Sequence, residues 1–115
     1  MTGFGRNGVS QESEYLYRQA RQNVEDGDYQ HAITILHKAV ESSPKYSQAF
    51  NELGICSEYL NRYEEAVTFY EKAIESDPHH ADAWFNKGMN LKKLGRDKEA
   101  LPCIEHAIAL YFGGV

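Results

Sequence analysis

The residues that could do chemistry in this 115-residue chain are five histidines and two cysteines. A zinc site needs clustered Cys and His ligands, for example two histidines four residues apart on one helix face. His31 and His37 are six residues apart and point in different directions on a helix, while His79 and His80 are neighbours that directly follow Pro78. The spacing therefore predicts no metal site, and we expect no other cofactor.

The pattern gives no better support for a nucleophilic or phosphate-binding site. A catalytic thiol needs a positioned base, and a phosphate loop needs a strand before its glycines and a Lys-Ser/Thr pair after them. Cys56 and Cys103 fall on apolar helix faces, where we expect them to pack as small hydrophobic residues in a reducing cytosol. Gly3, Gly5 and Gly8 lie in a tail that has neither flanking feature. We predict that the chain is not an enzyme.

The composition indicates one soluble, folded domain. The hydrophobic fraction is 42% and the charged fraction is 25%, as in globular proteins. The 17 acidic residues outnumber the 12 basic ones, which argues against nucleic-acid binding, because phosphate binding requires a basic surface. No segment approaches the ~20 apolar residues of a membrane span, and residues 1–12 lack the apolar run of a signal peptide. We expect a cytoplasmic protein without a membrane partner.

The elements that must position these side chains repeat with a period of about 34 residues. Alanine recurs at this interval in two columns, and a third column of small residues accompanies them. The members are Ala32, Ala66 and Ala100, then Ala39, Ala73 and Ala107, and finally Ala20, Gly54 and Gly88. Three passes without an insertion predict one domain with repeats over residues 13–46, 47–80 and 81–114, preceded by a disordered tail over residues 1–12.

Each repeat has the pattern of two helices joined by a tight turn. The turns are expected at Gly27-Asp28, Asn61-Arg62 and Gly95-Arg96, because Gly and Asn accept the left-handed conformation that ends a helix. Pro44 and Pro78 mark the boundaries between repeats, since proline lacks a helix donor and disfavours helix in the residue before it. We therefore predict an all-α fold, an α-α superhelix or solenoid of three antiparallel helix-turn-helix hairpins without strands.

The columns resemble the signature of the tetratricopeptide repeat, W-x2-L-G-x2-Y followed by A-x3-F, A and P. The second repeat supplies Phe50, Leu53, Gly54, Ala66, Tyr70, Ala73 and Pro78 at these positions. The resemblance extends over the three repeats and is specific for the fold. One departure is Pro102, which lies inside the expected last helix and should bend that helix or delay its start.

The resemblance implies a scaffold or adaptor that binds a partner peptide or helix in a concave groove, lined by the first helix of each repeat. The matching groove residues are Tyr17, Arg18, Arg21, Asn51, Glu52, Ile55, Tyr59, Asp82, Phe85, Asn86, Met89 and Lys93. Aromatic and arginine side chains are typical of binding hot spots. The acidic centre of the set favours a partner with a basic or amide-rich centre.

One branch of the family binds the C-terminal carboxylate of chaperones through basic and amide side chains. The residues that correspond to that clamp here are Tyr17, Arg21, Glu52, Asp82 and Asn86. Because two of the five are acidic and repel a carboxylate, we do not expect a chaperone tail to bind.

The last expected helix leaves room for other interpretations. Leu101, Ile104, Ile108 and Tyr111 give it an apolar side that no further helix in this sequence covers. Either the chain is a fragment of a longer protein, or this face self-associates, for instance in a homodimer. A third alternative makes the repeats a regulatory segment of a larger enzyme.

Overall fold

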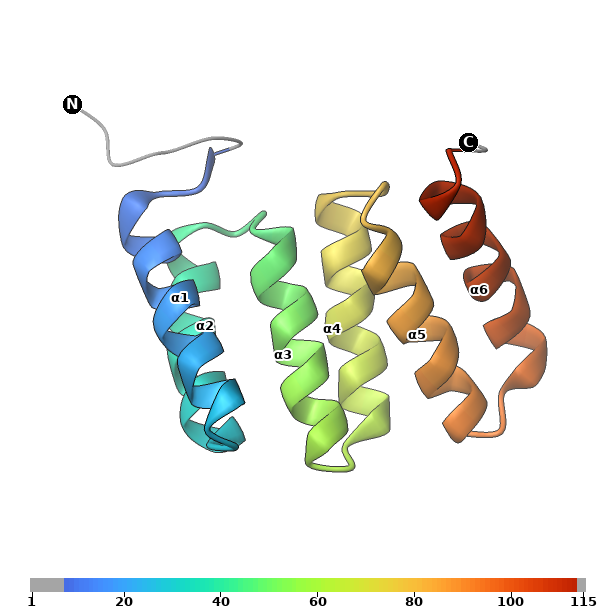
Figure 1. Cartoon of the computed structure of the whole chain (residues 1–115), viewed down its shortest axis with the longest axis horizontal. Coiled ribbons are helices and arrows are strands. Elements are labelled where there is room, and N and C mark those ends of the chain that lie inside the picture. The colour runs from blue at the N-terminus through green and yellow to red at the C-terminus, as the bar shows by residue number, and fades with distance from the viewer. Residues whose placement is uncertain (1–7, 114–115) are drawn as a thin grey trace.

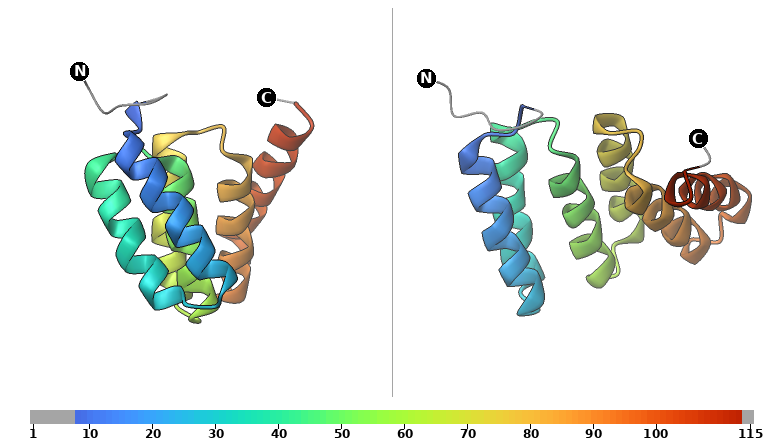
Figure 2. Two further views of the ribbon diagram at one scale, coloured as in Figure 1. Left: turned by 60° about the vertical axis from the view of Figure 1, so that its left-hand side comes forward. Right: turned by 45° about the horizontal axis from the view of Figure 1, so that its top comes forward.

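The computed structural model describes residues 8–113 and folds them into six α-helices in a row (Figure 1). The helices are α1 (Gln11–Glu25), α2 (Tyr29–Ser42), α3 (Ser47–Tyr59), α4 (Tyr63–Ser76), α5 (Ala81–Lys93) and α6 (Asp97–Tyr111). Each odd-numbered helix packs on the even-numbered helix that follows it, and α2 contacts α3 as α4 contacts α5. Figure 2 shows that the last hairpin is turned relative to the first. The predicted all-α solenoid of three hairpins is confirmed.

The turn inside each hairpin is made by a residue with positive φ. Gly27, Asn61 and Gly95 have φ values of 78°, 61° and 77°. In the second hairpin, the N–H of Arg62 donates to the carbonyl of Ser57 at 2.8 Å, and the equivalent bond in each of the other two hairpins has the same length. This is the Schellman arrangement, which satisfies carbonyl groups at the helix end. These turns all lie at the same end of the helices, along the lower edge of the row in Figure 1.

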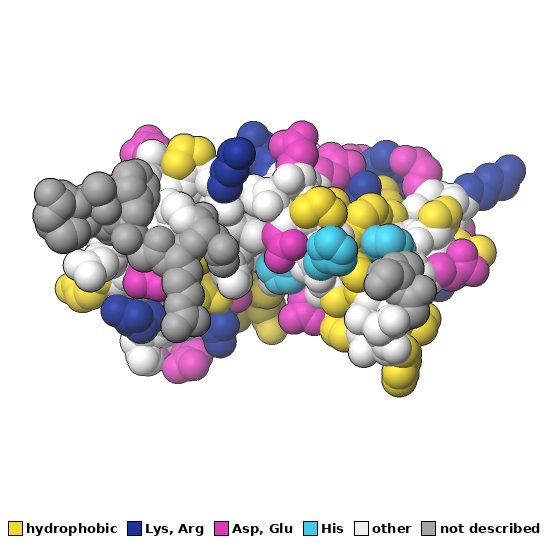
Figure 3. All heavy atoms as spheres, turned by 90° about the horizontal axis from the view of Figure 1, so that it is seen from above, with side chains coloured by type: hydrophobic (Ala, Val, Ile, Leu, Met, Phe, Trp, Pro, Cys, Tyr) yellow, Lys and Arg dark blue, Asp and Glu magenta, His cyan; other side chains and the backbone are white. Residues whose placement is uncertain are grey.

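The connections between hairpins lie at the opposite end of the helices and are also repeated. Ser43 and Asp77 are extended, with φ of −135° and −147°, as expected for residues that precede proline. The Ser47 hydroxyl donates to the Ala73 carbonyl at 2.8 Å, which fastens the start of α3 to the end of α4. Figure 3 views this end of the molecule and shows histidine side chains gathered beside hydrophobic ones near the α4–α5 connection.

Small residues set the distance between the two helices of a hairpin. The six alanines of the two predicted columns are at most 1% exposed. A Cβ atom added at Gly54 would lie 2.4 Å from Cε1 of Tyr70, and one added at Gly88 would lie 2.6 Å from Cγ1 of Ile104. The glycines therefore let the backbone of the odd helix approach a large side chain of the even helix.

The N-terminal boundary differs from the prediction. Residues 1–7 of the predicted tail lie outside the described residues, but α1 already begins at Gln11, and Val9 and Ser10 are each 8% exposed. Ser10 caps the helix, because its hydroxyl accepts a 3.0 Å bond from the Ser13 N–H and its own N–H donates to the Ser43 hydroxyl at 2.9 Å. The prediction of a disordered tail was wrong for residues 8–12, since this cap and its buried hydroxyl bonds hold them in place.

The last helix also starts where its counterparts start, in spite of Pro102. Helix α6 begins at Asp97, the position equivalent to Tyr63, which is the first residue of α4. Pro102 and Lys98, whose carbonyl loses its helix donor, are both exposed, so water can reach that carbonyl. Of the two effects predicted for Pro102, a bend or a delayed start, the delayed start was wrong. None of the helices in the part of the chain that the structure describes is long and apolar enough to cross a membrane.

Candidate partner-binding groove

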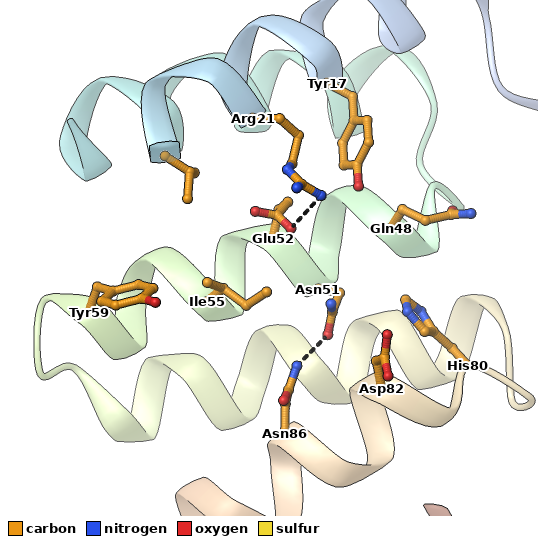
Figure 4. A pocket seen from close by; sticks show the side chains of 11 residues that line it. Tyr17, Arg21, Gln48, Asn51, Glu52, Ile55, Tyr59, His80, Asp82 and Asn86 are labelled. Carbon is orange, nitrogen blue, oxygen red and sulfur yellow. Dashed lines mark hydrogen bonds and ion pairs between the residues drawn. The ribbon is translucent and has the colours of Figure 1, made fainter. Parts of the chain in front are cut away.

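A groove with a volume of about 480 Å³ lies along α1, α3 and α5 (Figure 4). Its walls are formed by side chains three or four residues apart on each helix, which is the spacing of one helix face. The lining residues are Tyr17, Arg21, Val24, Gln48, Asn51, Glu52, Ile55, Tyr59, His80, Asp82 and Asn86. Helix α3 supplies five of these residues and forms the middle of the groove.

A buried carboxylate lies at the centre of the groove. Glu52 is only 5% exposed, and Nη1 of Arg21 on α1 lies 3.6 Å from its Oε1 (Figure 4). That separation allows an ion pair but is too long for a hydrogen bond. Burial raises the pKa of the Glu52 carboxyl, and the positive charge of Arg21 only partly opposes the rise. The carboxylate is therefore incompletely compensated.

Amide groups join α3 to α5 next to this carboxylate. The Nδ2 group of Asn86 donates to Oδ1 of Asn51 at 3.2 Å (Figure 4). Asn51 is 8% exposed, whereas Asn86 is half-buried and borders the open part of the groove. Each amide retains further donor or acceptor capacity after this bond. The pair can therefore bind either a C=O or an N–H group of a ligand.

His80 and Asp82 border the groove at the start of α5. Nδ1 of His80 lies 2.7 Å from the Ser47 hydroxyl, which already donates its proton to the Ala73 carbonyl. We therefore assign the Nδ1–H tautomer to His80, because the hydroxyl oxygen must act as the acceptor. Burial lowers the pKa of His80 and favours the neutral ring. The Asp82 carboxylate accepts a hydrogen bond from the Tyr111 hydroxyl of α6.

The rest of the groove surface is aromatic and aliphatic. Tyr59 is 61% exposed, and its ring stacks on Tyr29 of α2 with centroids 4.7 Å apart. Ile55 lies next to Tyr59 at the same end of the groove (Figure 4). Tyr17 tilts against Tyr46 at a centroid distance of 5.3 Å, and burial raises its pKa. These rings are held by neighbours and lose little freedom when a ligand binds.

Comparison with known families decides what kind of protein this is. Three models described as tetratricopeptide repeats match residues 14–46, 47–80 and 69–101. The chain belongs to the tetratricopeptide repeat family. The first two matches agree with the predicted repeats to within one residue. No curated protein sequence matches the chain at a significant level.

Solved tetratricopeptide structures share the fold. A crystal structure of MamA superposes with a TM-score of 0.85 at 23% identity, covering 90% of this chain and 60% of that one. The second tetratricopeptide domain of Spaghetti (RPAP3), bound to the HSP90 peptide SRMEEVD, gives 0.85 at 20% identity and covers 87% of this chain and 93% of its own. Another crystal structure of MamA gives 0.81 at 24% identity, with coverages of 86% and 54%. The chain thus spans little more than half the length of these MamA chains.

Eight of the twelve residues predicted for the tetratricopeptide groove line it in the structure. Arg18, Phe85, Met89 and Lys93 do not. Val24, Gln48 and His80 also line the groove and are not among the twelve. Val24 continues the stripe of Tyr17 and Arg21, so helical spacing could have found it, whereas His80 lies before the first residue of α5 and belongs to no helix stripe.

Lys93 belongs instead to a second polar cluster around Glu58. The Glu58 carboxylate accepts bonds from the Tyr70 hydroxyl at 3.0 Å, from Nδ2 of Asn90 at 2.9 Å and from Nζ of Lys93 at 3.2 Å. Burial alone would raise the pKa of Glu58, but the bonds from Asn90, Tyr70 and Lys93 hold it below its usual value. The cluster ties three helices together, so we interpret it as structural.

The predicted self-association face on α6 is mostly exposed. Leu101, Ile108 and Tyr111 are 58%, 48% and 51% exposed, and Phe112 directly after the helix is 85% exposed. Ile104 is an exception, because its side chain is half-buried against Gly88 of α5. It therefore presents less apolar surface on this face than the prediction assumed.

Cys56 and Cys103 are both buried free thiols. Burial raises the pKa of the Cys56 thiol to about 12, and burial also raises that of Cys103. A thiol that stays protonated at neutral pH is a poor nucleophile and a poor metal ligand. Among residues 8–113, no three His, Cys, Asp or Glu side chains are grouped to hold a metal ion.

Proposed function

We propose that the chain is a non-catalytic adaptor that holds a segment of a partner protein, an extended peptide or a helix, in the groove of α1, α3 and α5. The tetratricopeptide fold supports a protein-interaction module in general. The observation that supports this particular surface is that exposed aromatic rings such as Tyr59 border polar groups that the fold leaves incompletely paired, above all Glu52. Anchors around desolvated polar groups are typical of binding hot spots. The predicted cytoplasmic location remains a prediction.

The RPAP3 domain binds an acidic HSP90 peptide, but we propose a different ligand here. Glu52 and Asp82 occupy two positions of the carboxylate clamp, and the Arg21 guanidinium at a third position is paired with Glu52. A terminal carboxylate would meet two like charges, which costs binding energy. We therefore expect SRMEEVD to bind at least about tenfold more weakly to wild-type protein than to an Asp82→Asn/Glu52→Asn variant.

The groove is tested by selecting peptides from a displayed library against the purified protein. Affinities of the selected peptides are then compared between wild type, Ile55→Glu in the groove and Thr68→Glu on α4. Ile55 borders the groove, whereas Thr68 is exposed outside it. We expect Ile55→Glu alone to weaken binding by at least about tenfold. Equal losses in the two variants, or no selected peptide that depends on Ile55, would refute the groove.

The exposed side of α6 supports a second candidate function, pairing with a second copy. In α4 the position equivalent to Leu101 is Val67, which is 4% exposed because α5 covers it. On α3, by contrast, the fully buried Ala49 and Leu53 are equivalent to Tyr15 and Gln19 of α1. These two side chains of α1 are exposed and hydrogen-bonded to each other at 2.7 Å. The N-terminal helix therefore presents a polar end to the stack, which disfavours head-to-tail pairing and favours α6 against α6.

Light scattering on a size-exclusion column distinguishes this candidate. The chain mass is 13.1 kDa, so a dimer has about twice that mass. We expect a concentration-dependent dimer that Ile108→Glu returns to monomer and that Thr68→Glu leaves unchanged. A constant monomer mass over the whole concentration range would exclude self-association and leave the groove as the proposed interface.

A further inference from the structure

We propose that the groove selects partner segments that carry a lysine or arginine side chain, and that this side chain pairs with Glu52. The inference rests on the proposed function, because it specifies what the groove binds. It also requires an apolar residue about two positions from the basic one. The partner class is thus a basic, partly apolar segment rather than an acidic C-terminal tail.

The charge of the groove is the first reason. Its lining contains two carboxylates, Glu52 and Asp82, and one guanidinium, Arg21. His80 adds no positive charge at neutral pH, because burial lowers its pKa. Lys93, the nearest predicted cation along α5, is paired with Glu58 outside the groove lining. The groove therefore has a net negative charge that a cationic side chain complements.

The position of Glu52 is the second reason. It is only 5% exposed, yet among the residues that the structure describes it accepts no hydrogen bond, and its ion-pair partner lies 3.6 Å away. The Arg21 side chain is 48% exposed, so it can move aside into solvent while a ligand cation takes its place beside Glu52. A ligand ammonium or guanidinium could donate bonds at ordinary distances to the carboxylate. Such charge-assisted bonds are the strong ones in a partly desolvated site.

The spacing of the groove residues sets the distance between the basic and apolar residues of the ligand. Ile55 and Tyr59 follow Glu52 on α3 by three and seven residues, or about 5 and 10 Å along the helix axis. An extended peptide advances about 3.3 Å per residue. Its side chains alternate between two faces, so a residue two positions from the basic one points to the same side and reaches, after about 6.6 Å, the surface between Ile55 and Tyr59. That surface is apolar and aromatic, so a leucine, methionine or aromatic side chain fits it.

The experiment uses the same library selection and then designed peptides. Clones whose binding is lost in Ile55→Glu are sequenced, and we expect enrichment of Lys or Arg with an apolar residue two to four positions away. Groove-dependent clones without this enrichment would overturn the inference and leave the proposed function intact. An absence of any groove-dependent clone would instead refute the proposed function, and the inference with it.

Fluorescence anisotropy then measures a selected peptide and its copies in which the basic residue is Gln or Glu. We expect the Gln copy to bind wild-type protein at least about tenfold more weakly, and the Glu copy more weakly still. Glu52→Gln should erase most of this preference, whereas Glu75→Gln, the same charge change at an exposed position of α4, should preserve it. Circular dichroism confirms that both variants are folded. A preference that survives Glu52→Gln would show that Glu52 is not the recognition group.

Discussion

Replacement of Gly54 by alanine tests the close contact between α3 and α4. The added Cβ would lie 2.4, 2.6 and 2.7 Å from Cε1, Cδ1 and Cζ of Tyr70, whereas carbon atoms normally stay about 3.5–4.0 Å apart. Tyr70 is fully buried and its hydroxyl is bonded to Glu58, so its ring has little room to move.

The expected net effect is a loss of stability. Overpacking of this kind costs about 1–3 kcal/mol. Displacement of the Tyr70 hydroxyl from Glu58 adds about 1.5 kcal/mol, since hydrogen bonds to charged groups lie in that range. The better helix propensity of alanine returns about 1 kcal/mol. We therefore expect Gly54→Ala to lower the free energy of unfolding by about 2.5 kcal/mol and the melting temperature by roughly 10 °C.

The first repeat supplies the control for this reasoning. The same two positions there hold Ala20 and Leu36, both fully buried, so alanine is accepted where the facing side chain is smaller. Urea unfolding of Gly54→Ala, Tyr70→Leu and the double variant should show a favourable coupling of about 2 kcal/mol in the double variant. Unchanged stability of Gly54→Ala, or purely additive effects, would refute the contact argument.

Three further perturbations have expected outcomes. Glu58→Ala leaves the Tyr70 hydroxyl and one N–H of the Asn90 side-chain amide without an acceptor, so urea unfolding at pH 7 should show a loss of about 2 kcal/mol of stability. Because the pKa of Glu58 is lowered in the fold, this loss should shrink as pH falls below the ordinary value of 4.5. The pKa of Glu52 is raised, so its charge opposes folding above that value, and the stability of Glu52→Gln relative to wild type should grow between pH 4.5 and pH 7 in the same assay. Pro102→Ala restores a helix donor on an exposed face and should raise the free energy of unfolding by about 1–2 kcal/mol, and with it the midpoint of thermal unfolding. A lowered midpoint would contradict the helix geometry.

The fold could be predicted because its causes recur from repeat to repeat. Small residues at the helix crossing and a turn residue that accepts positive φ return in every repeat, a proline marks both boundaries between repeats, and each of these has a local physical meaning. The failures occurred where the chain does not repeat. The cap at Ser10 depends on the Ser43 hydroxyl 33 residues away, and no neighbouring repeat offers a comparison for it.

The groove was only partly predictable, because its membership depends on which side chains already have partners. Helical spacing placed Lys93 on the face that lines the groove, but the fold uses its charge at Glu58, and that pairing is specific to the second and third repeats. The same spacing identified Glu52, yet its importance comes from the weak pairing with Arg21, which a sequence cannot reveal. A repeat protein thus displays its fold in the columns that all repeats share. Its specificity lies in the polar groups that differ between repeats and that the scaffold leaves uncompensated, which is why Glu52 rather than any repeated residue is the place to test recognition.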